Sequence, residues 1–107
     1  MKQLLLCYIT CESVKEAKKI GKHLLNMRLA ACINIFPDMQ PMFFWPPKSG
    51  KIDESKEVVL IAKTTEDHYQ KLENEVTKIH SFDTPCVIAI PTKHVSKKYY
   101  DWLMGEI

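Results

Sequence analysis

The chain has 107 residues, 46% of them hydrophobic, and a formal net charge of +2 at pH 7. This length and composition fit one folded domain over residues 1–107 and exclude a chain that is disordered throughout. The small net charge predicts neither a nucleic-acid nor a membrane partner. The single arginine, Arg28, excludes a phosphate site built from several guanidinium groups.

The first residues lack the features of a targeting segment. The apolar run at 4–9 is shorter than the core of a secretory signal, and Glu12 follows it without a small-residue cleavage site. No window has the length of a membrane span. We therefore expect a cytoplasmic protein, in which the cysteines stay reduced: Cys7, Cys11, Cys32 and Cys86.

The first third of the chain is typical of a strand–helix–strand unit. A strand-like run at 4–9 is followed by a helical pattern at 13–27, and Ser13 with Glu16 forms a capping box at its start. A second strand is expected at 30–36. The predicted buried face of the helix consists of the residues at helical spacing: Val14, Ala17, Gly21, Leu24 and Leu25.

The same unit recurs in the second half. A β-branched strand is expected at 57–64, a helix at 65–80 and a strand at 85–90. The separation from Thr10 to Cys32 equals that from Thr64 to Cys86. Two such units joined by right-handed crossovers predict an α+β fold, the ferredoxin-like βαββαβ sandwich.

The segment between the units predicts an arm. Residues 37–56 are too many for a structureless loop in a compact domain, and turn-forming residues gather at 46–50. We expect a long central β-hairpin whose tip lies there. Because side chains alternate along a strand, Phe43, Phe44 and Trp45 cannot all face one core. At least one is exposed or covered by another subunit, or else the arm folds back over its own domain.

The C-terminal segment predicts a short helix. Ser96 is a plausible N-cap, and three residues of the following pattern share one face that must be buried somewhere: Tyr99, Trp102 and Leu103.

Candidate metal ligands lie around the end of the second predicted helix and at Cys32. His80 ends the second predicted helix, and Asp83 and Cys86 follow within a turn, so an imidazole, a carboxylate and a thiolate could together bind copper or zinc. The alternative is that His80 caps its helix, where the dipole favours a cation. Cys32 is either a small core residue or a thiol that binds Cu(I) in a cleft between subunits.

Several other functions are excluded by missing residues. The glycines are too far apart for a P-loop or a dinucleotide fingerprint. An acylphosphatase-like site would need an arginine after the first strand, where the sequence is TCES. An RNA-recognition sheet would need more aromatics than Tyr8 on its central strands. We therefore predict a protein that is not an enzyme and binds no nucleic acid.

Taken together, several motifs make the chain resemble the CutA divalent-cation tolerance family. They occur in order over nearly the whole length: RLAACINI (28–35), Trp45 with GKI (50–52), KTT (63–65), HSFDTP (80–85) and YYDWL (99–103). The resemblance implies a ferredoxin-like protomer and a tight homotrimer assembled through the hairpin arm and the C-terminal segment. It also implies a role in tolerance of copper or another divalent metal, with His80, Cys32 and Cys86 as the metal candidates.

The motifs also depart from the family. In some members a cysteine on the first strand helps to bind copper, and Ile9 holds that place here. The usual HPYEVPE is HSFDTPC, so Phe82 lacks a tyrosine hydroxyl and Cys86 replaces an acid. The fold also resembles that of trimeric PII signalling proteins. The alternative function is therefore a PII-like regulator or scaffold that binds a small molecule or a protein at subunit clefts.

Overall fold

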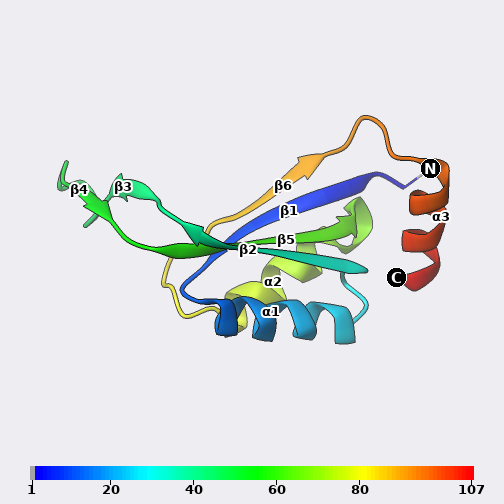
Figure 1. The fold of residues 1–107 in the computed structure, drawn as a ribbon, viewed down its shortest axis with the longest axis horizontal. Coiled ribbons are helices and arrows are strands. Elements are labelled where there is room, and N and C mark those ends of the chain that lie inside the picture. Colours follow the sequence, from blue (N-terminus) through cyan, green and yellow to red (C-terminus); the bar gives the residue numbers. More distant parts are fainter. Residues whose placement is uncertain (1) are drawn as a thin grey trace.

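The computed structural model describes residues 2–107 (Figure 1). The elements follow in this order: β1 (Leu4–Cys11), α1 (Val14–Asn26), β2 (Cys32–Met39), β3 (Met42–Phe44), β4 (Ile52–Glu54), β5 (Glu57–Thr65), a 3₁₀ turn (Glu66–His68), α2 (Tyr69–Ile79), β6 (Val87–Pro91) and α3 (Lys97–Glu106). When β3, β4 and α3 are set aside, the remaining strands and helices follow the order βαββαβ. This confirms the predicted order.

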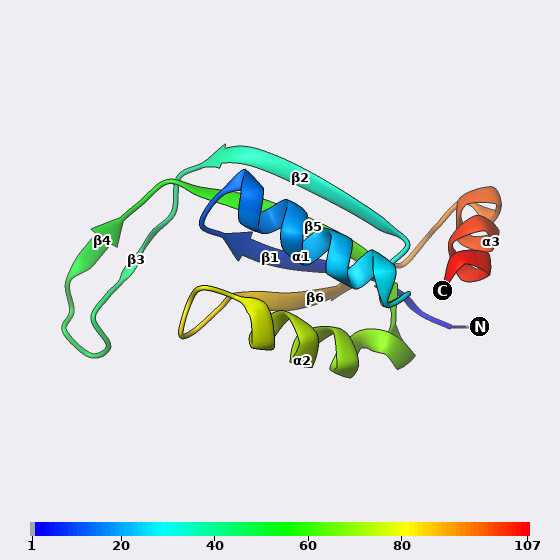
Figure 2. The ribbon, with the colours of Figure 1, turned by 90° about the horizontal axis from the view of Figure 1, so that it is seen from below.

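Four strands form one antiparallel sheet in the order β2-β5-β1-β6. Helices α1 and α2 lie side by side on the same face of this sheet (Figure 2). The strand order and the single helical layer are those of the ferredoxin-like sandwich. The opposite face of the sheet carries no layer of secondary structure from residues 2–107 (Figures 1 and 2).

The core lies between the sheet and the two helices. Alternate residues of β1 and β5 point into it, as the pleat of a strand requires. Its most buried members are Cys7, Ile9, Cys11, Ala17, Ile20, Leu24, Leu60, Ala62, Leu72 and Val76. Helix α1 approaches β2 so closely that a Cβ added at Gly21 would lie 2.9 Å from the Ile33 Cγ2 atom.

The predicted buried face of α1 is partly wrong. Ala17, Gly21 and Leu24 are buried, but Val14 and Leu25 are each 37% exposed, and Ile20 takes part in the core instead. Val14 is the first residue of the helix and Leu25 its last but one.

The predicted N-cap at the start of α1 is confirmed, but the second bond of the capping box differs from the prediction. The Glu16 N–H donates to Ser13 Oγ at 3.1 Å, whereas the Glu16 carboxylate accepts from the backbone N–H of Glu12, one residue before the cap, at 2.9 Å. At the other end, Arg28 adopts a left-handed conformation with φ of 56°, and its N–H donates to the Leu25 carbonyl. This is a Schellman-type helix end, at which glycine is the usual residue.

The predicted hairpin arm is confirmed. Strands β2 and β5 lead beyond the sheet into β3 and β4, which pair with each other (Figures 1 and 2). The Trp45 N–H donates to the Lys51 carbonyl at 3.0 Å and closes the tip. Phe43 is half-buried, whereas Phe44 is 71% and Trp45 43% exposed. With the arm, the protomer is 46 Å long.

Helix α3 lies at the end of the sheet away from the arm (Figure 1), where its Tyr100 hydroxyl donates to the Lys2 carbonyl at 2.7 Å. Ser96 is its N-cap by position, although its side chain makes no capping hydrogen bond within residues 2–107. Of the predicted buried face, Leu103 is fully buried, Tyr99 is half-buried and Trp102 is 47% exposed. The side chain of Arg28 donates to the Glu106 backbone carbonyl and carboxylate, both at 3.0 Å.

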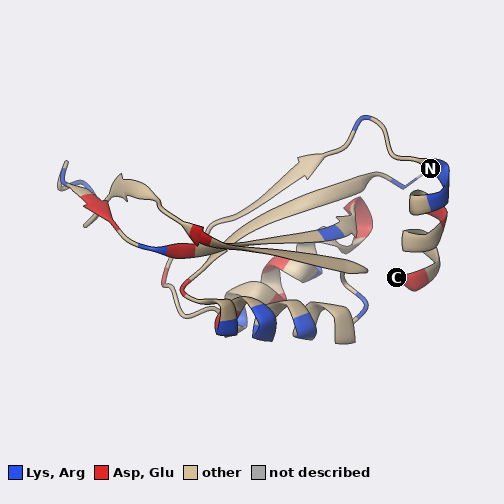
Figure 3. Cartoon of the chain, in the orientation of Figure 1, with Lys and Arg blue, Asp and Glu red and all other residues tan. Residues whose placement is uncertain are grey.

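Charged residues are concentrated on the helices, the arm and the loops (Figure 3). Strands β1 and β6 carry none, and β5 carries two, Glu57 at its start and Lys63 near its end. The face of the sheet opposite the helices is therefore largely apolar, and its exposed members include Phe36, Ile88 and Ile90.

Candidate functional site

The structure places the three candidate metal ligands in different parts of the protomer. His80 is the C-cap residue of α2, and Cys86 lies one residue before Val87, which pairs with Ile9. Cys32 begins β2, where it pairs with Lys63. His80 and Cys86 therefore flank the end of β1 from which α1 departs, whereas Cys32 lies toward the opposite end of the sheet.

Strand register gives the size of this separation. Cys11, at the His80 end of the sheet, pairs with Val58 of β5, and Cys32 pairs with Lys63 of the same strand. The two positions are roughly 16 Å apart at about 3.3 Å per residue. Within one protomer, therefore, Cys32 and His80 cannot bind the same ion.

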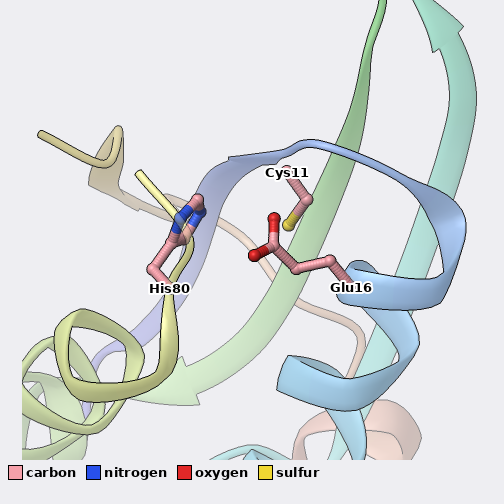
Figure 4. Close-up of side chains that lie close together, drawn as sticks. All are labelled: Cys11, Glu16 and His80. Atoms are coloured by element: carbon pink, nitrogen blue, oxygen red, sulfur yellow. The ribbon is translucent and has the colours of Figure 1, made fainter. Parts of the chain in front are cut away.

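Within residues 2–107, His80 instead meets two residues that the sequence did not single out as ligands. Its ring nitrogens, the Cys11 Sγ and the Glu16 carboxylate supply one potential ligand atom each, and these atoms lie within 4.8 Å of one another. Figure 4 shows the Glu16 carboxylate between the imidazole and the thiol. The three residues come from the loop after α2, the end of β1 and the first turn of α1. We call this group the Cys11–Glu16–His80 cluster.

Both ring nitrogens of His80 are already engaged. Nδ1 accepts a hydrogen bond from the Phe82 N–H at 3.0 Å, which assigns the ring proton to Nε2. Nε2 then donates to the backbone carbonyl of Thr10 at 2.8 Å. The imidazole thus joins the end of β1 to the turn after α2 and has no free lone pair for a metal.

The Glu16 carboxylate joins the same segments. One oxygen accepts from the Glu12 N–H and the other from the Ser81 N–H, both at 2.9 Å. Burial favours the neutral acid, but the hydrogen bonds from Ser81 and Glu12 outweigh it and hold the pKa of Glu16 below its ordinary value. Glu16 is therefore ionised at neutral pH.

The Cys11 thiol is protonated at neutral pH. It is fully buried, and this burial, with the nearby carboxylates of Glu16 and Glu57, raises its pKa to about 12. Because the thiolate is the form that binds metals, Cys11 is a poor ligand in this arrangement.

The cluster has the residue types of a copper or zinc site but not the free lone pairs. A metal would have to displace the Phe82 N–H or the Thr10 carbonyl from His80, and a proton from Cys11. In the protomer the cluster is therefore a structural clamp that fastens the end of β1, the start of α1 and the turn after α2.

The Cys86 thiol is half-buried nearby. Burial and the Glu57 carboxylate raise its pKa. Asp83, the third residue of the predicted His80 site, is exposed, and Cys86 and Asp83 do not take part in the cluster.

Comparison with known proteins identifies the family. The family model described as CutA1 divalent ion tolerance protein matches residues 5–106. The chain belongs to the CutA1 family. It is 42% identical over 96 residues to the divalent-cation tolerance protein CutA of Archaeoglobus fulgidus, with 90% of each chain covered. It is 36% identical over 95 residues to that of Thermus thermophilus, with 89% of each covered.

Solved CutA1 structures confirm the fold. The structure of CutA1 from Ehrlichia chaffeensis superposes with a TM-score of 0.91 at 32% identity and covers 99% of this chain and 96% of its own. The structure from Archaeoglobus fulgidus, described as a periplasmic protein, has a TM-score of 0.88 at 39% identity, with 99% and 98% covered. The predicted resemblance to the CutA family is thus confirmed.

As for membranes, each helix of this CutA1-family chain within residues 2–107 is too short or too polar to cross a bilayer.

Proposed function

We propose that this chain acts in divalent-cation tolerance as a homotrimer that binds copper or another divalent metal and has no catalytic activity. The match of residues 5–106 to the CutA1 family carries the proposal. The relatives from Archaeoglobus fulgidus and Thermus thermophilus are both named divalent-cation tolerance proteins, and neither name describes an enzyme.

The exposed apolar surface of the protomer supports assembly. Large apolar side chains are exposed along the arm, on the uncovered face of the sheet and on α3: Phe36, Met42, Phe44, Trp45, Ile52, Ile88, Ile90 and Trp102. Exposed apolar side chains of this size, gathered on the arm and on one face of the sheet, are typical of surfaces that other proteins cover. In the proposed trimer, neighbouring protomers cover the arm, the sheet face and the C-terminal segment.

The proposed metal ligands remain His80, Cys32 and Cys86. Because Cys32 and His80 lie far apart in one protomer, a shared ion would have to be bound by residues from two protomers. His80 would contribute only after losing one of its two hydrogen bonds, to Thr10 or to Phe82.

Titration of the reduced protein with Cu(I) and Cu(II) against a competing chelator tests the metal proposal, with oligomer mass followed in parallel. We expect saturable binding at a fixed ratio per protomer, weakened in at least one of Cys32→Ser, His80→Ala and Cys86→Ser while the trimer persists. Cys7→Ala is the matched control, because Cys7 is fully buried in the core. The absence of binding above chelator competition would refute the metal proposal.

One observation favours a second candidate function. The polar groups at this end of the sheet form no open metal site. His80 and Glu16 are engaged in hydrogen bonds, and the raised pKa values of Cys11 and Cys86 keep these thiols protonated. A PII-like trimeric regulator or scaffold that binds a small molecule or a protein partner would need no metal site. A stable trimer without metal binding would favour this candidate.

The cytoplasm remains the proposed location, and neither nucleic acid nor a membrane is a proposed partner. Related proteins vary in this respect. The Archaeoglobus fulgidus structure is described as periplasmic, and the relatives from rice and Arabidopsis thaliana are named chloroplastic. Fractionation of the native cells, followed with an antibody to the chain, tests the location.

A further inference from the structure

A groove runs between helix α1 and the edge strand β2, on the helical side of the sheet, and its volume is about 260 Å³. One wall consists of residues on a single face of α1, and the other consists of alternate residues of β2: Lys18, Gly21, Lys22 and Leu25, and Ile33 and Ile35. In the proposed trimer, neighbouring protomers cover the opposite face of the sheet. The groove therefore lies away from that interface.

The floor of the groove is apolar because α1 has no side chain at Gly21. A Cβ at this position would lie 2.9 Å from the Ile33 Cγ2 atom, so glycine allows the helix to approach the strand and leaves the isoleucine at the bottom of the groove. Ile33 and Ile35 are half-buried, and Leu25 is 37% exposed. Each of these side chains keeps apolar surface that only a partner outside residues 2–107 would bury.

The rim of the groove is positively charged. Lys18 and Lys22 are both exposed, and neither forms an ion pair with an acidic side chain in the described part of the chain, residues 2–107. The two lysines are one helical turn apart, which is about 6 Å along the axis at 1.5 Å per residue. The rim thus presents two unpaired ammonium groups beside an apolar floor.

The positive charge is a property of α1 rather than of the helical layer as a whole. Helix α1 carries four lysines and one acid, Glu16, whose carboxylate accepts from the N–H groups of Glu12 and Ser81. Helix α2 carries two lysines and two glutamates, so its charges balance (Figure 3). Lysines four residues apart on a helix destabilise it slightly, and α1 contains two such pairs. The stability of α1 therefore does not explain its lysines, whereas an acidic partner would.

We propose that this groove binds an acidic amphipathic peptide segment of another protein. Apolar side chains of the segment lie against Leu25, Ile33 and Ile35, and two of its carboxylates pair with Lys18 and Lys22. Carboxylates four residues apart on a helix have the required spacing of about 6 Å. A nucleic acid would pair with the lysines but leave the apolar floor uncovered, so the two features together favour a peptide.

Fluorescence anisotropy with the full chain, reduced and kept metal-free with a chelator, tests this interaction independently of metal binding. The probe is a labelled helical peptide with leucines along one stripe and glutamates four residues apart beside it. A second labelled peptide has alanine in place of every leucine. We expect saturable binding of the leucine peptide, about tenfold tighter than that of the alanine peptide. Oligomer mass is followed in the same samples, so a loss of assembly is distinguished from a loss of peptide binding.

Two pairs of variants separate docking in the groove from general attraction between charges. Lys22→Glu should weaken binding about tenfold, whereas Lys71→Glu, which makes the same charge change at an exposed position of α2, should have less than about a twofold effect. Leu25→Ala should weaken binding about fivefold. Val14→Ala is its matched control, because Val14 is also 37% exposed but lies outside the groove, and this variant should bind like the wild type.

All four substituted side chains are exposed, so the variants should fold, and circular dichroism verifies this. Equal weakening by Lys22→Glu and Lys71→Glu would overturn the proposal, because it would show attraction to the net charge alone. Equal binding of the leucine and alanine peptides would do the same, as would wild-type binding by Leu25→Ala. Failure of the leucine peptide to saturate the wild-type protein would also overturn it.

Discussion

Replacement of His80 by alanine tests whether this residue is a clamp in the protomer. The substitution leaves the Thr10 carbonyl, in a residue only 8% exposed, without its donor at 2.8 Å, and the Phe82 N–H without its acceptor at 3.0 Å. A buried polar group left without a partner costs about 1–3 kcal/mol. Because the turn at Phe82 is less buried, we expect a total loss of about 2–4 kcal/mol in the free energy of unfolding.

Urea unfolding of the reduced protein, at one protein concentration and followed by circular dichroism, measures this loss. Two variants divide it between the hydrogen bonds. His80→Gln retains a donor near Nε2 for the Thr10 carbonyl, and His80→Asn retains an acceptor near Nδ1 for the Phe82 N–H. Each should be intermediate in stability. If His80→Ala stayed within about 0.5 kcal/mol of the wild type, as ordinary surface substitutions do, the clamp interpretation would be wrong.

Three further predictions concern the acid response, the assembly and the end of α1. The pKa of Glu16 in the folded protein lies below its ordinary value of 4.5, so the ionised carboxylate stabilises the fold above pH 4.5, and this stabilisation is lost as the pH falls through the folded-state pKa. The Glu16→Gln variant should therefore be less stable than the wild type at pH 7 and should lose less stability on acidification. Parallel profiles of stability against pH for the two proteins would contradict this. Ile88→Lys places a charge on the uncovered face of the sheet, where Ile88 is 53% exposed. In sedimentation equilibrium this variant should have the 12.4 kDa mass of the protomer. The control Leu25→Lys, on α1, should keep the mass of the wild type. Arg28 has a left-handed backbone conformation with φ of 56°, which costs a non-glycine residue roughly 1–2 kcal/mol, and its exposed ion pair with Glu106 contributes about 0–1 kcal/mol. Arg28→Gly removes both, so the thermal midpoint of unfolding should rise. A lower midpoint would show that the ion pair contributes more than the strain.

Local signals in the sequence predicted most of the fold. The N-cap at Ser13, the repeated spacing of the two units and the turn residues at 46–50 each depend on neighbours in the chain, and each is confirmed. The buried face of α1 was predicted less well. Helical periodicity identifies an apolar stripe, but tertiary packing decides which parts of it are covered, and Val14 and Leu25, near the two ends of the helix, are each 37% exposed.

The contacts at the candidate site depend on tertiary structure. Glu16 was recognisable as part of a cap and His80 as the end of a helix, whereas Cys11 lies two residues beyond the predicted strand at 4–9. Only the packing of α1 beside α2 brings the three together. The distance between Cys32 and His80 likewise follows from strand register, which sequence spacing does not reveal.

Native mass spectrometry of the reduced protein, with Cu(I) supplied from a competing chelator, gives the assembly and the bound metal in one experiment. We expect a species of three times the 12.4 kDa protomer mass that takes up copper in a fixed ratio per protomer. A metal-free protomer at 12.4 kDa under the same conditions would contradict it.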